Sequence, residues 1–99
     1  MLVVDDYIKK LDIRGISHYI VQPDGYNPLV IYVVEASEGV SRTALLYGHL
    51  DKQPWMEGWD EGLHPTTPTI RGGRMYGRGT SDDGYSPFSC MLAVKACQE

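Results

Sequence analysis

The sequence lacks a long hydrophobic run, a secretory leader and an excess of positive charge. No apolar stretch approaches the ~18 residues that cross a bilayer. Charged residues interrupt the apolar positions near the start, at Asp5, Asp6, Lys9 and Lys10. The 9 basic residues are outnumbered by 13 acidic ones, which gives a formal net charge of −4. These absences argue against a membrane span and against nucleic acid or an anionic membrane as a partner.

Cysteine is also scarce. The two cysteines, Cys90 and Cys97, fall seven positions apart in what the apolar pattern predicts to be one helix. At ~1.5 Å of rise per residue their Cα atoms would lie roughly 10 Å apart, which is too far for a disulfide. We therefore expect two reduced thiols and a cytoplasmic location.

The 99 residues amount to one domain or a piece of one. Helical spacing of apolar residues predicts an amphipathic helix over 2–14, with Gly15 as its C-terminal cap. A β-rich stretch at 17–22 and an apolar run at 29–35 predict two strands joined by a turn, the second of them covered on both faces. A further apolar run predicts a second fully apolar strand over 43–49.

The second half predicts a long loop, a hairpin and a helix. Residues 52–69 have no periodicity, and a hairpin is expected around Gly72 and Gly73. A helix is expected from about Ser86, apolar on both sides and therefore central and buried. Taken together, these elements predict an α/β fold with a mixed sheet flanked by helices.

A histidine and a carboxylate follow the predicted strand 43–49. His49 and Asp51 are two positions apart, so both can project to one side beyond the end of the strand. That edge of an open α/β sheet is where ligands bind. One interpretation is a metal-binding imidazole oriented by a carboxylate. The other is a histidine satisfied by local hydrogen bonds and an aspartate that starts a turn.

Paired carboxylates precede the last helix, at Asp82 and Asp83. A structural interpretation is available, because Ser81 or Asp82 is a good N-cap and acids favour a helix N-terminus. Two adjacent carboxylates are nevertheless costly to hold together without a compensating cation or donor. A divalent metal is such a cation, and an aspartate can bridge two ions in two-metal hydrolases.

Taken in order, "LLYGHLDKQP" and "GGRMYGRGTSDDG", followed by a helix of small residues, resemble a known family. It is the co-catalytic zinc metallopeptidase family of carnosinase-type dipeptidases, glutamate carboxypeptidases, aminoacylases and succinyl-diaminopimelate desuccinylases. The resemblance covers residues 29–98, and "LDKQP" is most similar to the dipeptidase branch. One departure is that Gly84 and Tyr85 stand where the family usually has lysine and glycine.

The resemblance implies a role for each matching residue. His49 would bind one zinc ion, and Asp82 would bridge two. Asp51 would belong to the catalytic machinery by orienting the imidazole of His49. The peptide bond between Asp82 and Asp83 would be cis. Zn²⁺ is the implied cofactor, two ions in the parent enzyme, with Mn²⁺ or Co²⁺ as alternatives.

The resemblance also implies an activity and an incomplete site. We expect residues 1–99 to be the N-terminal part of a zinc-exopeptidase-like catalytic domain, with further ligands, a general base and a lid or dimerisation domain C-terminal to it. The parent would be a homodimeric dipeptidase or carboxypeptidase that hydrolyses small peptides with a metal-activated water. The chain alone is expected to be inactive, since a catalytic site needs three or more protein ligands. The alternatives are an N-acyl amino acid deacylase of the same family and a non-catalytic α/β binding module.

The two other histidines favour structural roles. His18 lies within a predicted strand, and His64 precedes a proline in the long loop, where a solvent-facing side chain is expected. The loop tryptophans Trp55 and Trp59 are expected to pack the loop onto the body of the protein.

Overall fold

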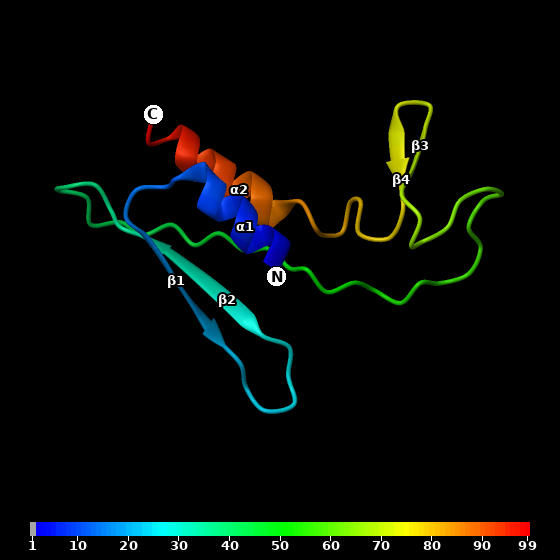
Figure 1. The fold of residues 1–99 in the computed structure, drawn as a ribbon, viewed down its shortest axis with the longest axis horizontal. Helices are drawn as coiled ribbons and strands as arrows, with labels where there is room; N and C mark the ends of the chain where they lie inside the picture. The colour runs from blue at the N-terminus through cyan, green and yellow to red at the C-terminus, as the bar shows by residue number, and fades with distance from the viewer. Residues whose placement is uncertain (1) are drawn as a thin grey trace.

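A computed structural model describes residues 2–99, and these residues form two helices and four short strands (Figure 1). In chain order the elements are α1 (Leu2–Leu11), β1 (Ile16–Val21), β2 (Leu29–Val34), β3 (Thr69–Arg71), β4 (Arg74–Tyr76) and α2 (Ser86–Ala96). The α/β class is confirmed. The strands pair as two separate antiparallel ribbons, β1 with β2 and β3 with β4, rather than in the mixed sheet that we expected.

Helix α1 is shorter than predicted. It ends at Leu11 rather than at residue 14, because Asp12 adopts a left-handed backbone with φ of 50°. An aspartate tolerates this conformation better than most residues do. The chain then turns through Gly15, whose φ is 65°, and enters β1. Apart from this early end, the helix lies where its apolar spacing predicted.

The ribbon of β1 and β2 contains the two predicted strands, but β2 is not covered on both faces as expected, since Leu29 and Val33 are 55% and 43% exposed. Its register runs from Ile16 opposite Val34 to Val21 opposite Leu29. The predicted turn between the strands is closed by a hydrogen bond from the Tyr26 amide to the Pro23 carbonyl, at 3.2 Å. Both strands therefore form within one residue of their predicted bounds.

The predicted strand over 43–49 is wrong for this structure. Residues 36–63 contain no helix or strand, and the apolar side chains of the segment are exposed, 93% for Leu45 and 79% for Tyr47. A strand exists only where its backbone groups pair with a neighbour. Within residues 2–99 no segment pairs with this one, so the apolar run remains extended but unpaired.

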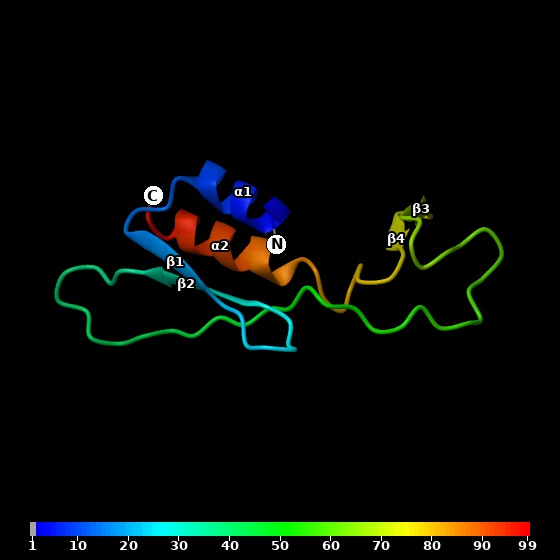
Figure 2. The same cartoon turned by 60° about the horizontal axis from the view of Figure 1, so that its bottom comes forward.

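The two helices pack side by side (Figures 1 and 2), and the few buried hydrophobic side chains lie in or just after α1. Tyr7 meets Phe88 edge to face, with ring centroids 5.1 Å apart. Val4, Ile8 and Ile13 are the buried hydrophobic side chains in the described chain.

Helix α2 is not the buried central helix that we expected. None of its residues is buried, and Leu92 is 52% exposed. Apolar residues on both sides of a helix need two neighbours, and in residues 2–99 only α1 packs extensively against α2.

The ends of the helices are tied together by polar contacts. The Arg14 amide donates to the side-chain oxygen of Gln98 at 2.8 Å, and the Gln98 side-chain nitrogen donates to the Arg14 carbonyl at 3.0 Å. The Lys95 ammonium also reaches the Asp12 carbonyl, at 3.5 Å. These contacts fix the segment that follows α1 against the end of α2.

The hairpin of β3 and β4 forms as predicted, away from the helices (Figure 1). Its turn residues Gly72 and Gly73 have φ of 57° and 73°, the left-handed pair that a tight two-residue turn requires. None of the helices in the described chain is long and apolar enough to span a membrane.

Candidate metal site

The site begins where the extended segment 43–48 passes the first turn of α2. A Cβ atom added to Gly48 would overlap the Ser86 hydroxyl oxygen and lie 3.1 Å from the Pro87 ring. Only glycine leaves room for so close an approach. The next residue, His49, is thereby brought beside the loop that precedes α2.

The structure brings together all three residues predicted for the site. His49 Nε2 lies 3.2 Å from Asp82 Oδ1, and His49 Nδ1 lies 3.2 Å from Asp51 Oδ1. The Asp51 carbonyl oxygen is also 3.2 Å from Nδ1. The imidazole is therefore held between two carboxylates, one on each ring nitrogen. Its side chain is 33% exposed, whereas those of Asp51 and Asp82 are 73% and 75% exposed.

The surroundings of the His49 ring raise its pKa overall. Burial by itself lowers the pKa of His49, but the Asp51 carbonyl, the hydrogen bond to Asp82 and the two negative charges outweigh it and raise the pKa overall. Without a cation the ring can donate to both aspartates as an imidazolium. A cation on the Asp82 side would take the place of the Nε2 proton, and Nδ1 would still donate to Asp51.

His49 and Asp82 fit a divalent metal as a ligand pair. Imidazole nitrogen and carboxylate oxygen are both zinc ligands, and two such atoms on one tetrahedral ion lie roughly 3.3 Å apart. The observed 3.2 Å between Nε2 and Oδ1 agrees with that spacing. The pair is only part of a site, because residues 2–99 contain no group of three or more His, Cys, Asp or Glu side chains placed to hold a metal.

The Asp83 carboxylate holds the loop that precedes α2 in place through hydrogen bonds. Its Oδ1 accepts the amides of Gly84 at 2.6 Å and Ser86 at 3.2 Å, and its Oδ2 accepts the Ser86 hydroxyl. Oδ2 also accepts the His49 amide, at 3.4 Å. Asp83 therefore links the start of α2 to the backbone of the candidate ligand.

These bonds stabilise the charged form of Asp83. The Ser86 hydroxyl is the main cause and, although desolvation opposes it, the amides of Ser86, Gly84 and His49 add to it. The pKa of the Asp83 carboxyl consequently lies well below its usual range.

Two expectations about this loop are corrected. The side chain that accepts hydrogen bonds at the start of α2 is Asp83, not Ser81 or Asp82. The peptide bond between Asp82 and Asp83 is trans, as are all the others in the described chain, rather than cis. With its carboxylate turned back onto the helix start, Asp83 is not available as a second candidate ligand.

Lys52 is the site residue that sequence reasoning missed. Its ammonium group donates to backbone carbonyls of both loops, at Leu50 and Asp83. The only signal in the sequence was a basic residue three positions after His49, directly after Asp51. Proximity in space, which the sequence does not give, is what makes this lysine part of the site.

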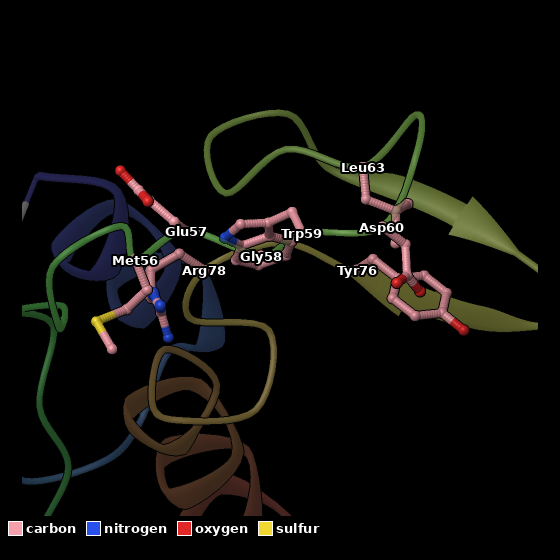
Figure 3. Close-up of a pocket in the computed structure, with 8 residues that line it drawn as sticks. All are labelled: Met56, Glu57, Gly58, Trp59, Asp60, Leu63, Tyr76 and Arg78. Atoms are coloured by element: carbon pink, nitrogen blue, oxygen red, sulfur yellow. The ribbon is translucent and has the colours of Figure 1, made fainter.

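A separate hollow lies along the loop 56–63 (Figure 3). It measures about 330 Å³ and is lined by Met56, Glu57, Gly58, Trp59, Asp60, Leu63, Tyr76 and Arg78. The Arg78 guanidinium lies 5.8 Å from the centre of the Trp59 ring and donates to the Trp55 carbonyl at 3.1 Å. Trp59 is thus partly packed, as predicted, but Trp55 is 64% exposed and does not hold the loop to the body. None of the three predicted site residues lines this hollow.

The remaining histidines have the structural surroundings that we expected. His18 lies in β1, 3.8 Å from the Asp5 carboxylate and tilted against the Tyr32 ring. His64 is exposed, and its Nδ1 accepts the amide and hydroxyl of Thr66 at 3.3 Å and 2.9 Å. Cys90 and Cys97 are both free, as predicted.

Comparison with known proteins gives two findings. The sequence profile of Peptidase family M20/M25/M40 matches residues 45–99, which include the candidate site. The Cys-Gly metallodipeptidase dug1 of Schizosaccharomyces pombe is 31% identical over 106 residues, an alignment that covers 98% of this chain and 21% of the yeast protein. The chain therefore spans about a fifth of the length of this curated relative.

Proposed function

Since the chain belongs to Peptidase family M20/M25/M40, we propose that it forms part of the catalytic domain of a metal-dependent dipeptidase. Membership of this family was the prediction from the two motifs. The proposal concerns the reaction, because the chain covers only a fifth of its relative. The dipeptidase branch is supported by the similarity to a protein named as a Cys-Gly metallodipeptidase.

The observation that carries the proposal is the placement of His49. Its Nε2 faces Asp82 Oδ1 at 3.2 Å, while its Nδ1 faces Asp51. A histidine that binds a metal through one nitrogen commonly donates its other N–H to a carboxylate or carbonyl, which fixes the tautomer and the orientation of the ring. Asp51 supplies both kinds of acceptor from a single residue.

Each residue then has a distinct part. His49 and Asp82 would hold a divalent ion, with Zn²⁺ as the proposed metal. When bound, such an ion supplies Lewis acidity, which activates water and polarises a peptide carbonyl. Asp51 orients the imidazole and stabilises its Nδ1 proton. Asp83 holds the His49 backbone against the first turn of α2 and keeps the pair together.

We further propose that residues 1–99 do not turn over substrate alone. They bring two candidate ligands to one place, whereas a catalytic zinc site uses three protein ligands and an open position. Purified chain 1–99 is expected to leave dipeptides intact with Zn²⁺, Mn²⁺ or Co²⁺ added. Robust hydrolysis by this chain would contradict the proposal.

Hydrolysis itself is tested in the natural polypeptide that carries residues 1–99. Metal-loaded protein is assayed with Cys-Gly and, for comparison, with N-acetyl amino acids, which a deacylase would prefer. His49→Ala and Asp82→Asn should each abolish turnover of the dipeptide. His64→Ala is the matched control, since this exposed histidine lies outside the site and should be replaceable. Unchanged turnover in both site variants would refute the assignment.

A further inference from the structure

The Lys52 side chain joins the two loops that carry the candidate ligands. Its Nζ donates to the Leu50 carbonyl at 2.9 Å and lies 3.5 Å from the Asp51 carbonyl, both in the loop that follows His49. The same Nζ donates to the Asp83 carbonyl, in the loop that carries Asp82. An ammonium group has three donors and no acceptor, and here all three are directed at backbone oxygens.

The second loop is shaped to receive this side chain. A Cβ atom added to Gly79 would lie 2.6 Å from Lys52 Cδ, and one added to Gly84 would lie 3.6 Å from Lys52 Nζ. Gly79 also has a left-handed backbone, with φ of 84°. A larger residue at this position is therefore disfavoured both by the backbone conformation and by contact with the Lys52 side chain. The lysine stem therefore occupies space that Gly79 leaves open, whereas a Cβ atom at Gly84 would meet its ammonium group only at ordinary contact distance.

The positive charge of Lys52 is electrostatically favourable at this position. Two carboxylates, those of Asp51 and Asp82, face the His49 imidazole, and a third, that of Asp83, accepts the His49 backbone amide. Like charges held this close repel one another, and a nearby cation reduces that cost. Because Nζ is bonded to carbonyls, its charge acts from a fixed position while the carboxylates of Asp51 and Asp82 stay free to face His49.

We propose that Lys52 is a positioning residue, which holds the loop 49–52 against the loop 82–84 so that His49 and Asp82 are paired before a metal arrives. This inference rests on the proposed function, in that the pair is taken to bind a divalent metal. It adds a residue outside the ligand set and assigns it the preorganisation of that set. Some residues support metal ligands without binding the metal themselves. Replacing such a residue typically changes metal affinity by roughly 10–100-fold.

The test compares Lys52→Met, which keeps the length of the stem and removes the charge, with Lys52→Arg, which keeps a cation. Lys10→Met is the matched control, because Lys10 is an exposed lysine on α1. In the metal-free chain, NMR follows the Overhauser effects between the His49 ring protons and the Asp82 methylene protons. Calorimetry then measures Zn²⁺ binding to each variant of the same chain.

The expected result is that Lys52→Met loses the Overhauser effects between His49 and Asp82 and binds Zn²⁺ roughly 10–100-fold more weakly. Lys52→Arg should retain part of the Overhauser effects and part of the Zn²⁺ affinity. Lys10→Met should match the parent chain in both measurements. Unchanged Overhauser effects in Lys52→Met would overturn the inference, even if zinc binding by the parent chain upheld the proposed metal site. Conversely, loss of these effects in a chain that binds no zinc would support the positioning role and count against the metal site.

Discussion

The imidazole of His49 is the residue on which the account depends, because each of its two nitrogens has its own carboxylate. Asp82 lies at Nε2 and Asp51 at Nδ1, both at 3.2 Å. The two acids are equivalent in distance but not in role, since Asp51 also presents its backbone carbonyl to the same nitrogen. The proposed function therefore places the metal on the Asp82 side of the ring and gives the Asp51 side the role of orienting it.

Replacing Asp51 tests this division of roles. Asp51→Asn removes the charge behind the ring but keeps the backbone carbonyl, so orientation should be weakened rather than lost. We expect Zn²⁺ affinity to fall roughly 10-fold, at the low end of the range for such supporting groups. Calorimetry gives the affinity, and nitrogen chemical shifts of His49 report the tautomer. An affinity equal to that of the parent chain would show that Asp51 has no orienting role.

The first turn of α2 organises the site, although it contributes no candidate ligand. Asp83 accepts both the Ser86 amide and the His49 amide, and Gly48 lets the chain pass next to Ser86 and Pro87. The ligand pair is therefore made where an extended segment touches a helix start. Disturbing that contact should separate the ligands without unfolding the helices.

Gly48→Ala is the change that tests this contact. The added methyl group would overlap the Ser86 hydroxyl and press on the Pro87 ring, which cannot move aside easily. We expect weaker Zn²⁺ binding, with the helix signal in circular dichroism unchanged. The larger Gly48→Val should have a greater effect in the same direction. Full zinc affinity in both variants would mean that the close approach does not set the site.

The Asp5 carboxylate of α1 has a lowered pKa and lies beside the ribbon of β1 and β2. The hydrogen bond from Lys9, at 2.6 Å, is the main reason that the pKa of Asp5 is lowered, and desolvation opposes it. Asp5 also lies near His18 of β1 and Tyr32 of β2. A carboxyl with a lowered pKa contributes stability above its ordinary value of 3.8, and loses it as the pH falls toward its folded value.

We predict that the difference in stability between the parent chain and an Asp5 variant becomes smaller as the pH falls. Asp5→Asn should lower the urea midpoint of unfolding near neutral pH, and the gap to the parent chain should narrow below about pH 4. Asp6→Asn, next to it on the exposed side of α1, is the control and should change the midpoint little. A gap that stays constant with pH would rule out the Asp5 carboxylate as its source.

How far the elements could be predicted depends on whether their causes are local. The hairpin at Gly72 and Gly73 and the start of α2 at Ser86 were predictable, because turn glycines and helical spacing act within a few residues. The absence of a strand over 43–49 was not predictable, because strand pairing requires a partner and residues 2–99 do not provide one. The proximity of His49 to Asp82, 33 positions apart, was available only through the family resemblance.

The molecule as a whole is extended and thinly packed. Its radius of gyration is 16.8 Å, against about 13 Å for a compact domain of this length. It exposes 8233 Å² of surface, where a compact protein of 11.1 kDa would expose roughly 5,700 Å². Many large hydrophobic side chains are exposed, and Leu45, Tyr47 and Ile70 are among the most exposed of them. Little buried area is therefore available to hold the fold.

Because the core is small, each buried side chain contributes a large share of the free energy of unfolding. Ile8 of α1 is 4% exposed, and Ile8→Ala should cost about 2–5 kcal/mol in free energy of unfolding, a large share of what so small a core supplies. We expect the helix signal to melt at a much lower temperature. Val3→Ala on the same helix is the control, because Val3 is 72% exposed. Equal melting of the two variants would contradict the packing of α1 against α2.

The measurement that tests the central claim most directly is a calorimetric titration of the chain with Zn²⁺ at neutral pH. The parent chain, His49→Ala and the control His64→Ala are titrated side by side. The account predicts stoichiometric binding by the parent chain and the control, and its loss in His49→Ala. Binding that survives in His49→Ala, or a parent chain that takes up no zinc, would contradict a metal site formed by His49 and Asp82.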